Sequence, residues 1–212
     1  MSIREKKAVF FKMKKGVVLL SVALLLLLLV GHASPQANEQ APQVLLILRE
    51  YMVSSDKQHM ISNEVIVMKS MLEEAGFKIV IASASVPTFV HGDITLESNL
   101  RLADVKVSDY VGFLFPCMCL GTWTVKPEEV AIAKQAVATG KPVAAQRKGV
   151  VILSNAGVLE GKRHAYYTGQ GIYIEEGVVQ DGNIITSAYC PHHGSRDQTV
   201  ELTQALITAL QE

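Results

Sequence analysis

The sequence has no excess of charge of either sign, since its 212 residues include 20 Lys and Arg against 20 Asp and Glu. The charges are unevenly placed: residues 1–33 hold six of the basic residues and one acid, which leaves 14 basic and 19 acidic residues in the remainder. That remainder carries a net charge of −5 and has no basic stripe. A mildly acidic domain of this kind is a poor candidate for nucleic-acid binding, so we expect no nucleic-acid partner.

Cysteine is also scarce, and the three that occur are Cys117, Cys119 and Cys190. None lies near the end of the N-terminal apolar run, which argues against a lipid-modified N-terminus. The cysteine and histidine spacing fits no standard zinc signature. The sequence therefore predicts no cofactor and no metal site of a standard type. It has no internal repeat, and its length gives room for one ordinary domain.

The N-terminal segment has the three parts of a secretory signal peptide. Six basic residues precede the apolar run Val17–Val30, which only Ser21 interrupts, and the small residues Gly31 and Ala33 follow it. We expect cleavage before Ser34, because the run is shorter than the about 20 residues that a membrane span needs. An uncleaved anchor over residues 1–33, touching the membrane through residues 17–30, is the alternative.

Both interpretations place the folded part outside the cytoplasm, in the periplasm or secreted, because basic residues stay on the cytoplasmic side. Either Met1 or Met13 could be the initiator, since Met13 is followed by two lysines and would make a good signal start. Residues 34–42 are polar and contain proline, which is typical of a linker, and the domain is expected over residues 43–212.

Strands and helices alternate along this domain, which predicts an α/β sandwich with a mainly parallel sheet. The strands are expected at 44–48, 78–82, 110–115, 143–145 and 164–168, with a hairpin over 178–186. The helices are expected at 61–75, from 127 to a stop at Gly140, after 149, and at 199–210. The apolar run 44–48 is typical of a central strand that is covered on both faces.

The segment from Lys141 to Gly149 predicts a nucleophile elbow, a sharp turn from a strand into a helix. A short apolar strand, Val143–Ala145, runs into a polar turn, and Gly149 opens the next apolar run. Such an elbow lifts one side chain into a pocket above the sheet. The raised side chain here is that of Arg147, where enzymes built this way carry serine or cysteine.

In four stretches the sequence resembles the DJ-1/PfpI family of the class I glutamine amidotransferase-like superfamily. The stretches are the helix 64–76, the strand 113–116 followed by 120–121, the elbow 141–149 with 155–162, and the hairpin 179–187. Together they span roughly residues 43–210. The resemblance implies a flavodoxin-like three-layer sandwich and a homodimer.

The resemblance also implies where the pocket lies and that the pocket lacks the family's nucleophilic cysteine. The family's elbow, Ala-Ile-Cys-His-Gly, places its nucleophilic cysteine on Arg147 and the following histidine on Lys148. The helix glutamate that hydrogen-bonds this cysteine falls on Glu64. The Pro-Gly-Gly oxyanion turn becomes 116–118, and a second histidine falls near Tyr167. The residues implied to line the pocket are Glu64, Cys117, Met118, Gln146, Arg147, Lys148 and Tyr167.

Arg147 needs an anion nearby, because a cation at a helix N-terminus is disfavoured by about 0.3–1 kcal/mol. We expect a buried ion pair with Glu64. The alternative is a bound carboxylate or phosphate, which suits the planar fork of arginine. Lys148 is expected to be a solvated surface charge.

The cysteines leave three alternatives open. Cys190 could bridge to Cys117 or Cys119, as an oxidising compartment favours. The cysteines, together with His192 and His193, could instead hold zinc or copper, because thiolates and imidazoles suit both metals. Cys190 or Cys117 could also act as a relocated nucleophile, with its pKa lowered by His192 or His193.

The sequence thus predicts an exported binding module, with a small anion as its ligand, that lacks the cysteine chemistry of the family. One alternative is a hydrolase or lyase of the DJ-1/PfpI type (peptidase, glyoxalase or deglycase-like) that uses a relocated cysteine. The other is a redox or metal-handling protein.

Overall fold

The computed structural model describes residues 41–49, 58–86, 88–91, 94–118, 124–175 and 177–212, and residues 41–212 form one compact unit. The predicted signal peptide or anchor lies outside the described residues, as does Cys119. Within the described ranges, no helix has the length and apolar character needed to cross a membrane.

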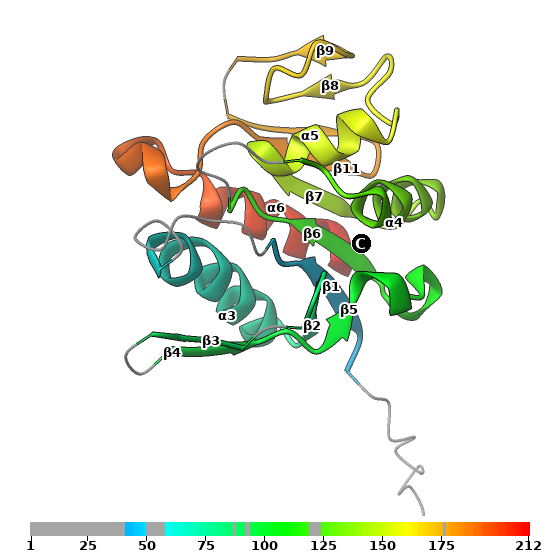
Figure 1. The fold of residues 1–212 in the computed structure, drawn as a ribbon. Coiled ribbons are helices and arrows are strands. Elements are labelled where there is room, and N and C mark those ends of the chain that lie inside the picture. Colours follow the sequence, from blue (N-terminus) through cyan, green and yellow to red (C-terminus); the bar gives the residue numbers. More distant parts are fainter. Residues whose placement is uncertain (1–40, 50–57, 87, 92–93, 119–123, 176) are drawn as a thin grey trace, which may run out of the picture. The chain divides into compact units, whose positions relative to one another are not determined.

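A seven-stranded sheet forms the centre of this unit, in the order β10-β11-β7-β6-β1-β2-β5 (Figure 1). The strands are β1 (Gln43–Ile47), β2 (Lys78–Ser83), β5 (Leu100–Arg101), β6 (Gly112–Phe115), β7 (Val143–Gln146), β10 (Val178–Asp181) and β11 (Ile184–Ser187). Neighbouring strands are parallel except for β10, which runs antiparallel to β11 as the outer strand of a hairpin.

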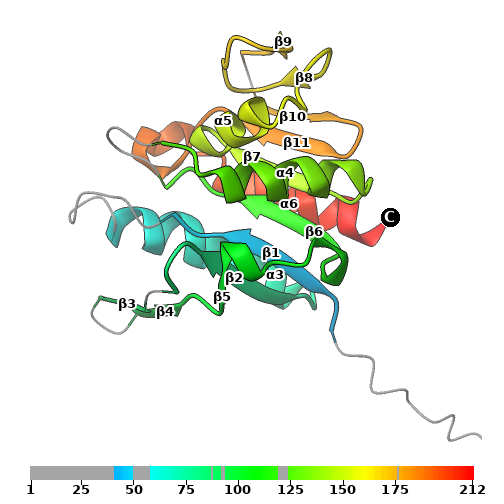
Figure 2. The same ribbon diagram turned by 45° about the vertical axis from the view of Figure 1, so that its right-hand side comes forward.

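Two helices cover each face of the sheet (Figure 2), α3 (Ile66–Glu74) and α6 (Thr199–Gln211) on one, and α4 (Pro127–Ala138) and α5 (Lys148–Asn155) on the other. A π-helical segment, η1 (Ile61–Val65), continues into α3. The α/β fold class, with a mainly parallel flavodoxin-like sheet between helical layers, is confirmed.

Strand β1 shows why the sheet is covered on both sides. Side chains alternate between the two faces of a strand. Val44 and Leu46 pack into the cluster that contains α3 and α6, whereas Leu45 and Ile47 pack into the cluster that contains α4 and α5. All four are buried, as the unbroken apolar sequence of this strand predicted.

The parallel strands bring their carboxyl ends to one edge of the sheet, where ligands bind in folds of this type. At this edge β1 leads to Arg49, β6 to the turn 116–118, β7 to Arg147, and β11 to the segment that contains Cys190. Residues from four distant parts of the chain therefore lie at this edge.

Smaller elements lie around this core: the hairpin β3 (Thr88–His91) and β4 (Ile94–Glu97), the pair β8 (Arg163–His164) and β9 (Ile172–Tyr173), and the 3-10 helices η2 (Leu102–Asp104), η3 (Val107–Asp109) and η4 (Pro191–Arg196). The strand expected at 164–168 is wrong beyond residue 164. The chain turns there through Gly169 and Gly171, both at positive φ, and β9 then pairs with β8 in parallel.

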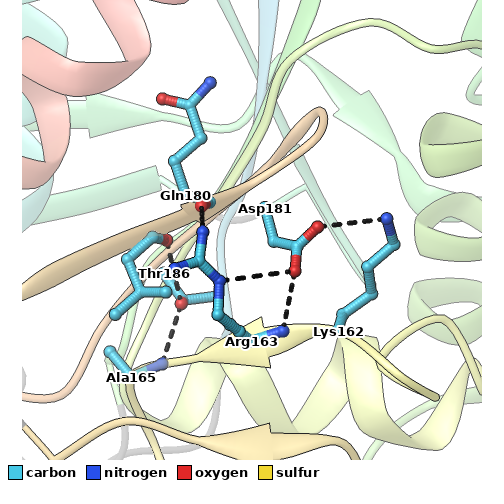
Figure 3. A network of polar contacts seen from close by, with 7 residues as sticks. Lys162, Arg163, Ala165, Gln180, Asp181 and Thr186 are labelled. Carbon is cyan, nitrogen blue, oxygen red and sulfur yellow. Dashed lines mark hydrogen bonds and ion pairs between the residues drawn. The ribbon is translucent and has the colours of Figure 1, made fainter.

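A polar network joins β8 to the β10–β11 hairpin (Figure 3). The Asp181 carboxylate accepts hydrogen bonds from the Lys162 ammonium at 3.2 Å and from the Arg163 backbone N–H at 3.0 Å. The backbone N–H of Ala165 donates to the Thr186 hydroxyl at 2.9 Å. These bonds fix the start of the segment that carries Tyr166.

Candidate functional site

The elbow predicted between β7 and α5 has the strained backbone of such turns. Arg147 adopts φ 42° and ψ −102°, a region that residues other than glycine rarely occupy. Its backbone N–H donates to the Ser187 carbonyl at 2.7 Å, which ties the elbow to β11. A Cβ at Gly149 would overlap the carbonyl of Phe115, so only glycine lets α5 pack this closely against β6.

The side chain of Arg147 extends over the ring of Tyr166. The guanidinium carbon lies 5.7 Å from the ring centroid, and the Lys148 ammonium lies 5.7 Å from the same centroid. All three side chains are half-buried. In the part of the chain that the structure describes, no ion pair includes Arg147 or Lys148. Two cations therefore share one aromatic ring, and no acid among the described residues is bonded to either.

The predicted ion pair between Glu64 and Arg147 is wrong. Glu64 is fully buried, and its two carboxylate oxygens accept hydrogen bonds from the backbone N–H groups of Cys117 at 2.6 Å and Met118 at 3.0 Å. These donors belong to the turn 116–118, which the resemblance aligned with the family's oxyanion turn. Met118 has φ 38° in this turn. The carboxylate caps the turn instead of reaching the elbow.

Burial raises the pKa of Glu64 well above its ordinary value, and the neighbouring Cys117 raises it further. The hydrogen bonds from Met118 and Cys117 and the charge of Arg49 act in the opposite direction and offset only part of this rise. The cation that acts on Glu64 is therefore Arg49, a residue that the sequence analysis missed.

Arg49 follows β1 at the carboxyl edge of the sheet and is almost fully buried. Its Nη2 donates to the carbonyl of Pro116, next to the turn that Glu64 caps. Its position directly after a buried strand was the available signal in the sequence.

Three sulfur-bearing side chains form a separate buried cluster at the same edge, made of Met60, Cys117 and Cys190. Neither of these two cysteines forms a disulfide, so the disulfide predicted between Cys190 and Cys117 is not present. The bridge to Cys119 lies outside the described residues. The hydrogen bond with the Cys117 thiol raises the pKa of the Cys190 thiol far above its usual range, and burial adds to the rise.

The two histidines proposed as partners of Cys190 differ in position. The Nδ1 atom of His193 lies 3.6 Å from the Cys190 Sγ atom and 3.2 Å from its carbonyl oxygen. His192 is exposed, and its ring centroid lies 6.1 Å from that of His193. The structure thus brings His193 to Cys190, but the raised pKa of Cys190 is the opposite of what a thiolate nucleophile requires.

Two further predicted pocket residues have different surroundings. Gln146 is fully buried, and its Nε2 atom donates to the Tyr189 carbonyl at 2.7 Å and to the Thr199 hydroxyl at 3.1 Å. It therefore joins β7 to α6. Tyr167 is 70% exposed and packs edge-on against Tyr173. Its neighbour Tyr166, rather than Tyr167, lies against Arg147.

The metal site considered for the cysteines and histidines is not formed by the residues described, because no group of three or more His, Cys, Asp or Glu side chains among them is arranged to hold an ion.

Comparison with known proteins agrees with this fold. The sequence pattern of the DJ-1/PfpI family matches residues 49–195. An uncharacterized protein of Archaeoglobus fulgidus is 33% identical over 132 residues, covering 55% of this chain and 75% of its relative. A deglycase of Pyrococcus abyssi is 32% identical over 127 residues, covering 55% and 76%.

Among solved structures, a ThiJ/PfpI domain protein from Brachyspira murdochii superposes with a TM-score of 0.63 at 20% identity. The match covers 80% of this chain and 96% of that protein. The length of the sequence match and the shared sheet topology lead to one conclusion: this chain belongs to the DJ-1/PfpI family.

Proposed function

We propose that this protein is an exported binding member of the family that takes up a small carboxylate or phosphate at its elbow. The observation that carries the proposal is the pair of cations, Arg147 and Lys148, that lie against Tyr166 with no acid bonded to either among the described residues. Charges held together in this way repel each other, and a bound anion would relieve the repulsion.

Three physical features support an anion as the ligand. The planar guanidinium of Arg147 can form two parallel hydrogen bonds to a carboxylate or phosphate. The N-terminus of α5, which begins at Lys148, adds a positive partial charge that disfavours the cations but favours an anion. The backbone strain at Arg147 costs about 1–3 kcal/mol and is of the kind that clusters at ligand sites.

The deglycase activity named for the Pyrococcus abyssi relative is not part of this proposal. The elbow position holds arginine, which cannot act as a thiol nucleophile. The N–H donors of the turn at Cys117 and Met118 are bonded to Glu64, so they cannot also stabilise an oxyanion while that contact holds. We expect no glyoxalase or deglycase turnover above background.

The experiment is a calorimetric titration of the full-length chain, in mild detergent, with inorganic phosphate and with succinate as probes. Arg147→Ala should weaken binding by about 10- to 100-fold, the value of a charge-assisted hydrogen bond of about 1.5–3 kcal/mol. The affinity of the Arg147→Lys variant should fall between those of wild type and Arg147→Ala, because lysine keeps the charge and loses the planar guanidinium.

The matched control is Lys134→Ala, which removes an exposed cation from α4 and should leave both affinities unchanged. Wild-type protein that binds neither probe, or an Arg147→Ala variant that binds as well as wild type, would refute the elbow as the anion site.

A further inference from the structure

The buried cluster of Met60, Cys117 and Cys190 plays no part in anion binding at the elbow. Its members come from three separate segments: the helical residues that precede η1, the turn after β6, and the residue before η4. Met60 and Cys117 are fully buried, and Cys190 is nearly so. The two thiols are hydrogen-bonded to each other, and the side chain of Met60 packs in the same buried cluster.

The chemistry of this set of donors is selective. Thiolate and thioether sulfur are soft ligands that prefer Cu(I), zinc and iron–sulfur clusters. Structural zinc requires four ligands in a tetrahedron, and iron–sulfur clusters are usually held by four cysteines. Two thiolates and one thioether match neither requirement. Cu(I), a soft ion that accepts few ligands, fits the set that is present.

We propose that Met60, Cys117 and Cys190 bind one Cu(I) ion, or another soft monovalent cation of the same chemistry. Binding exchanges the ion for the two thiol protons: two sulfur–metal bonds form from Cys117 and Cys190, two protons leave to solvent, and the Met60 thioether adds a third, neutral ligand. No electron is transferred, and the copper enters as Cu(I). The proposal does not depend on the ligand of the elbow.

The surroundings of the cluster suit this exchange. Cys117 and Cys190 are both almost fully shielded from solvent, so an ion held between their sulfurs would be protected from water as a competing ligand. The Nδ1 atom of His193 lies 3.6 Å from the Cys190 sulfur, close enough to orient it as an outer-shell partner. Such partners tune metal sites in proteins.

The competing interpretation is that the three side chains only fill space, because cysteine and methionine are common in apolar cores. The two interpretations differ in what the reduced protein does with copper. The full-length chain, reduced and kept free of oxygen, is titrated with Cu(I) in competition with the chromophoric chelator bicinchoninate.

We expect one Cu(I) per chain. Cys117→Ser and Cys190→Ser should each weaken the affinity by more than about 100-fold, because loss of an outer-shell partner alone costs about 10- to 100-fold. Met60→Leu, which keeps the volume and removes the sulfur, should weaken it by about 10-fold. The matched control is Met68→Leu, a change at another fully buried methionine that packs in a different cluster, and it should not alter the affinity.

A second measurement avoids variants that fail to fold. In wild-type protein, Cu(I) should protect Cys117 and Cys190 from alkylation, read peptide by peptide by mass spectrometry. The proposal is overturned if reduced wild-type protein does not compete for Cu(I), or if both cysteines are alkylated equally with and without the ion. Arg147→Ala should bind Cu(I) as wild type does, which separates this test from that of the elbow.

Discussion

At the scale of single residues, the elbow combines a strained backbone with a cationic side chain. Arg147 holds a positive φ that an ordinary residue adopts at a cost, although its side chain can perform none of the thiol chemistry for which such turns are used. The strain is therefore present at an elbow that carries no thiol. We connect it with the position of the guanidinium over Tyr166.

Arg147→Gly should separate stability from binding. Glycine tolerates positive φ, so the free energy of unfolding should rise by about 1 kcal/mol, the lower end of the cost of such strain. Binding of phosphate or succinate should be lost. Urea denaturation and calorimetry measure the two effects. Lys148→Gly is the control: it lies in α5, where glycine is unfavourable, and should not stabilise. A destabilised Arg147→Gly variant would contradict the assignment of strain.

Glu64 supports the turn rather than the elbow, and a mutant cycle can show this. Glu64→Ala leaves the buried N–H groups of Cys117 and Met118 without an acceptor, at about 1–3 kcal/mol for each. Its cost should add to that of Arg147→Ala within about 0.5 kcal/mol. The costs of Glu64→Ala and Arg49→Ala in unfolding free energy should instead differ from additivity by about 0.5–3 kcal/mol in the double variant. Chemical denaturation of the single and double variants tests both statements, and the reverse pattern would restore the pair between Glu64 and Arg147.

At the scale of elements, the sequence predicted what local pattern determines. Continuous apolar runs predicted β1, β2 and β7. The turn Asp181–Gly182–Asn183 predicted the β10–β11 hairpin, because a turn of this composition between two short strands defines a hairpin locally. The strands β8 and β9 have only two residues each, too few to show a period. Their pairing depends on contacts with β10 that are distant in the sequence.

The candidate site was predicted in the same uneven way. The elbow between β7 and α5 followed from residues 141–149, because adjacent residues set a turn. The partners of Glu64 and of the cysteines did not follow, because they depend on where β1, β6 and β11 end in space. Arg49 and Met60 were missed for this reason, since neither belongs to a recognisable motif.

The element scale also carries a prediction about pH. The Arg163 backbone N–H and the Lys162 ammonium hold the pKa of Asp181 below its ordinary value. A carboxyl with a depressed folded pKa stabilises the fold above its unfolded pKa, about 3.9. That contribution is lost as the pH falls through the folded value. Asp181→Asn should therefore remove this part of the acid dependence.

In the same variant, amide hydrogen exchange at Arg163 should become faster at neutral pH, because its N–H loses a charged acceptor. Exchange at Ile185 in the central sheet serves as the internal control and should stay slow. Unchanged exchange at Arg163 would mean that β8 is held without the network of Figure 3.

At the scale of the whole molecule, the proposed export rests on the N-terminal segment. We expect the protein from its native host to begin at Ser34, with the 33 preceding residues removed. Intact-mass spectrometry of the extracytoplasmic fraction measures this directly. Replacing Leu24 to Leu27 with polar residues should abolish cleavage and retain the protein in the cytoplasm. A protein recovered with its first 33 residues, in the membrane fraction, would favour the anchor instead.

The assembly expected from the family resemblance is a homodimer. Light scattering of the detergent-solubilised chain at micromolar concentration should give twice the chain mass of 23.1 kDa after subtraction of detergent. A monomer mass under these conditions would count against it.

The contact between Glu64 and the turn at Cys117 and Met118 bears on any redesign of the elbow. Replacing Arg147 with cysteine would place a thiol at the elbow, but the turn's amide donors would still be bonded to the protein's own carboxylate. A thiol there would lack these two N–H groups as partners for a developing negative charge. Installing nucleophilic chemistry therefore depends on freeing the turn from Glu64 as well as on changing residue 147.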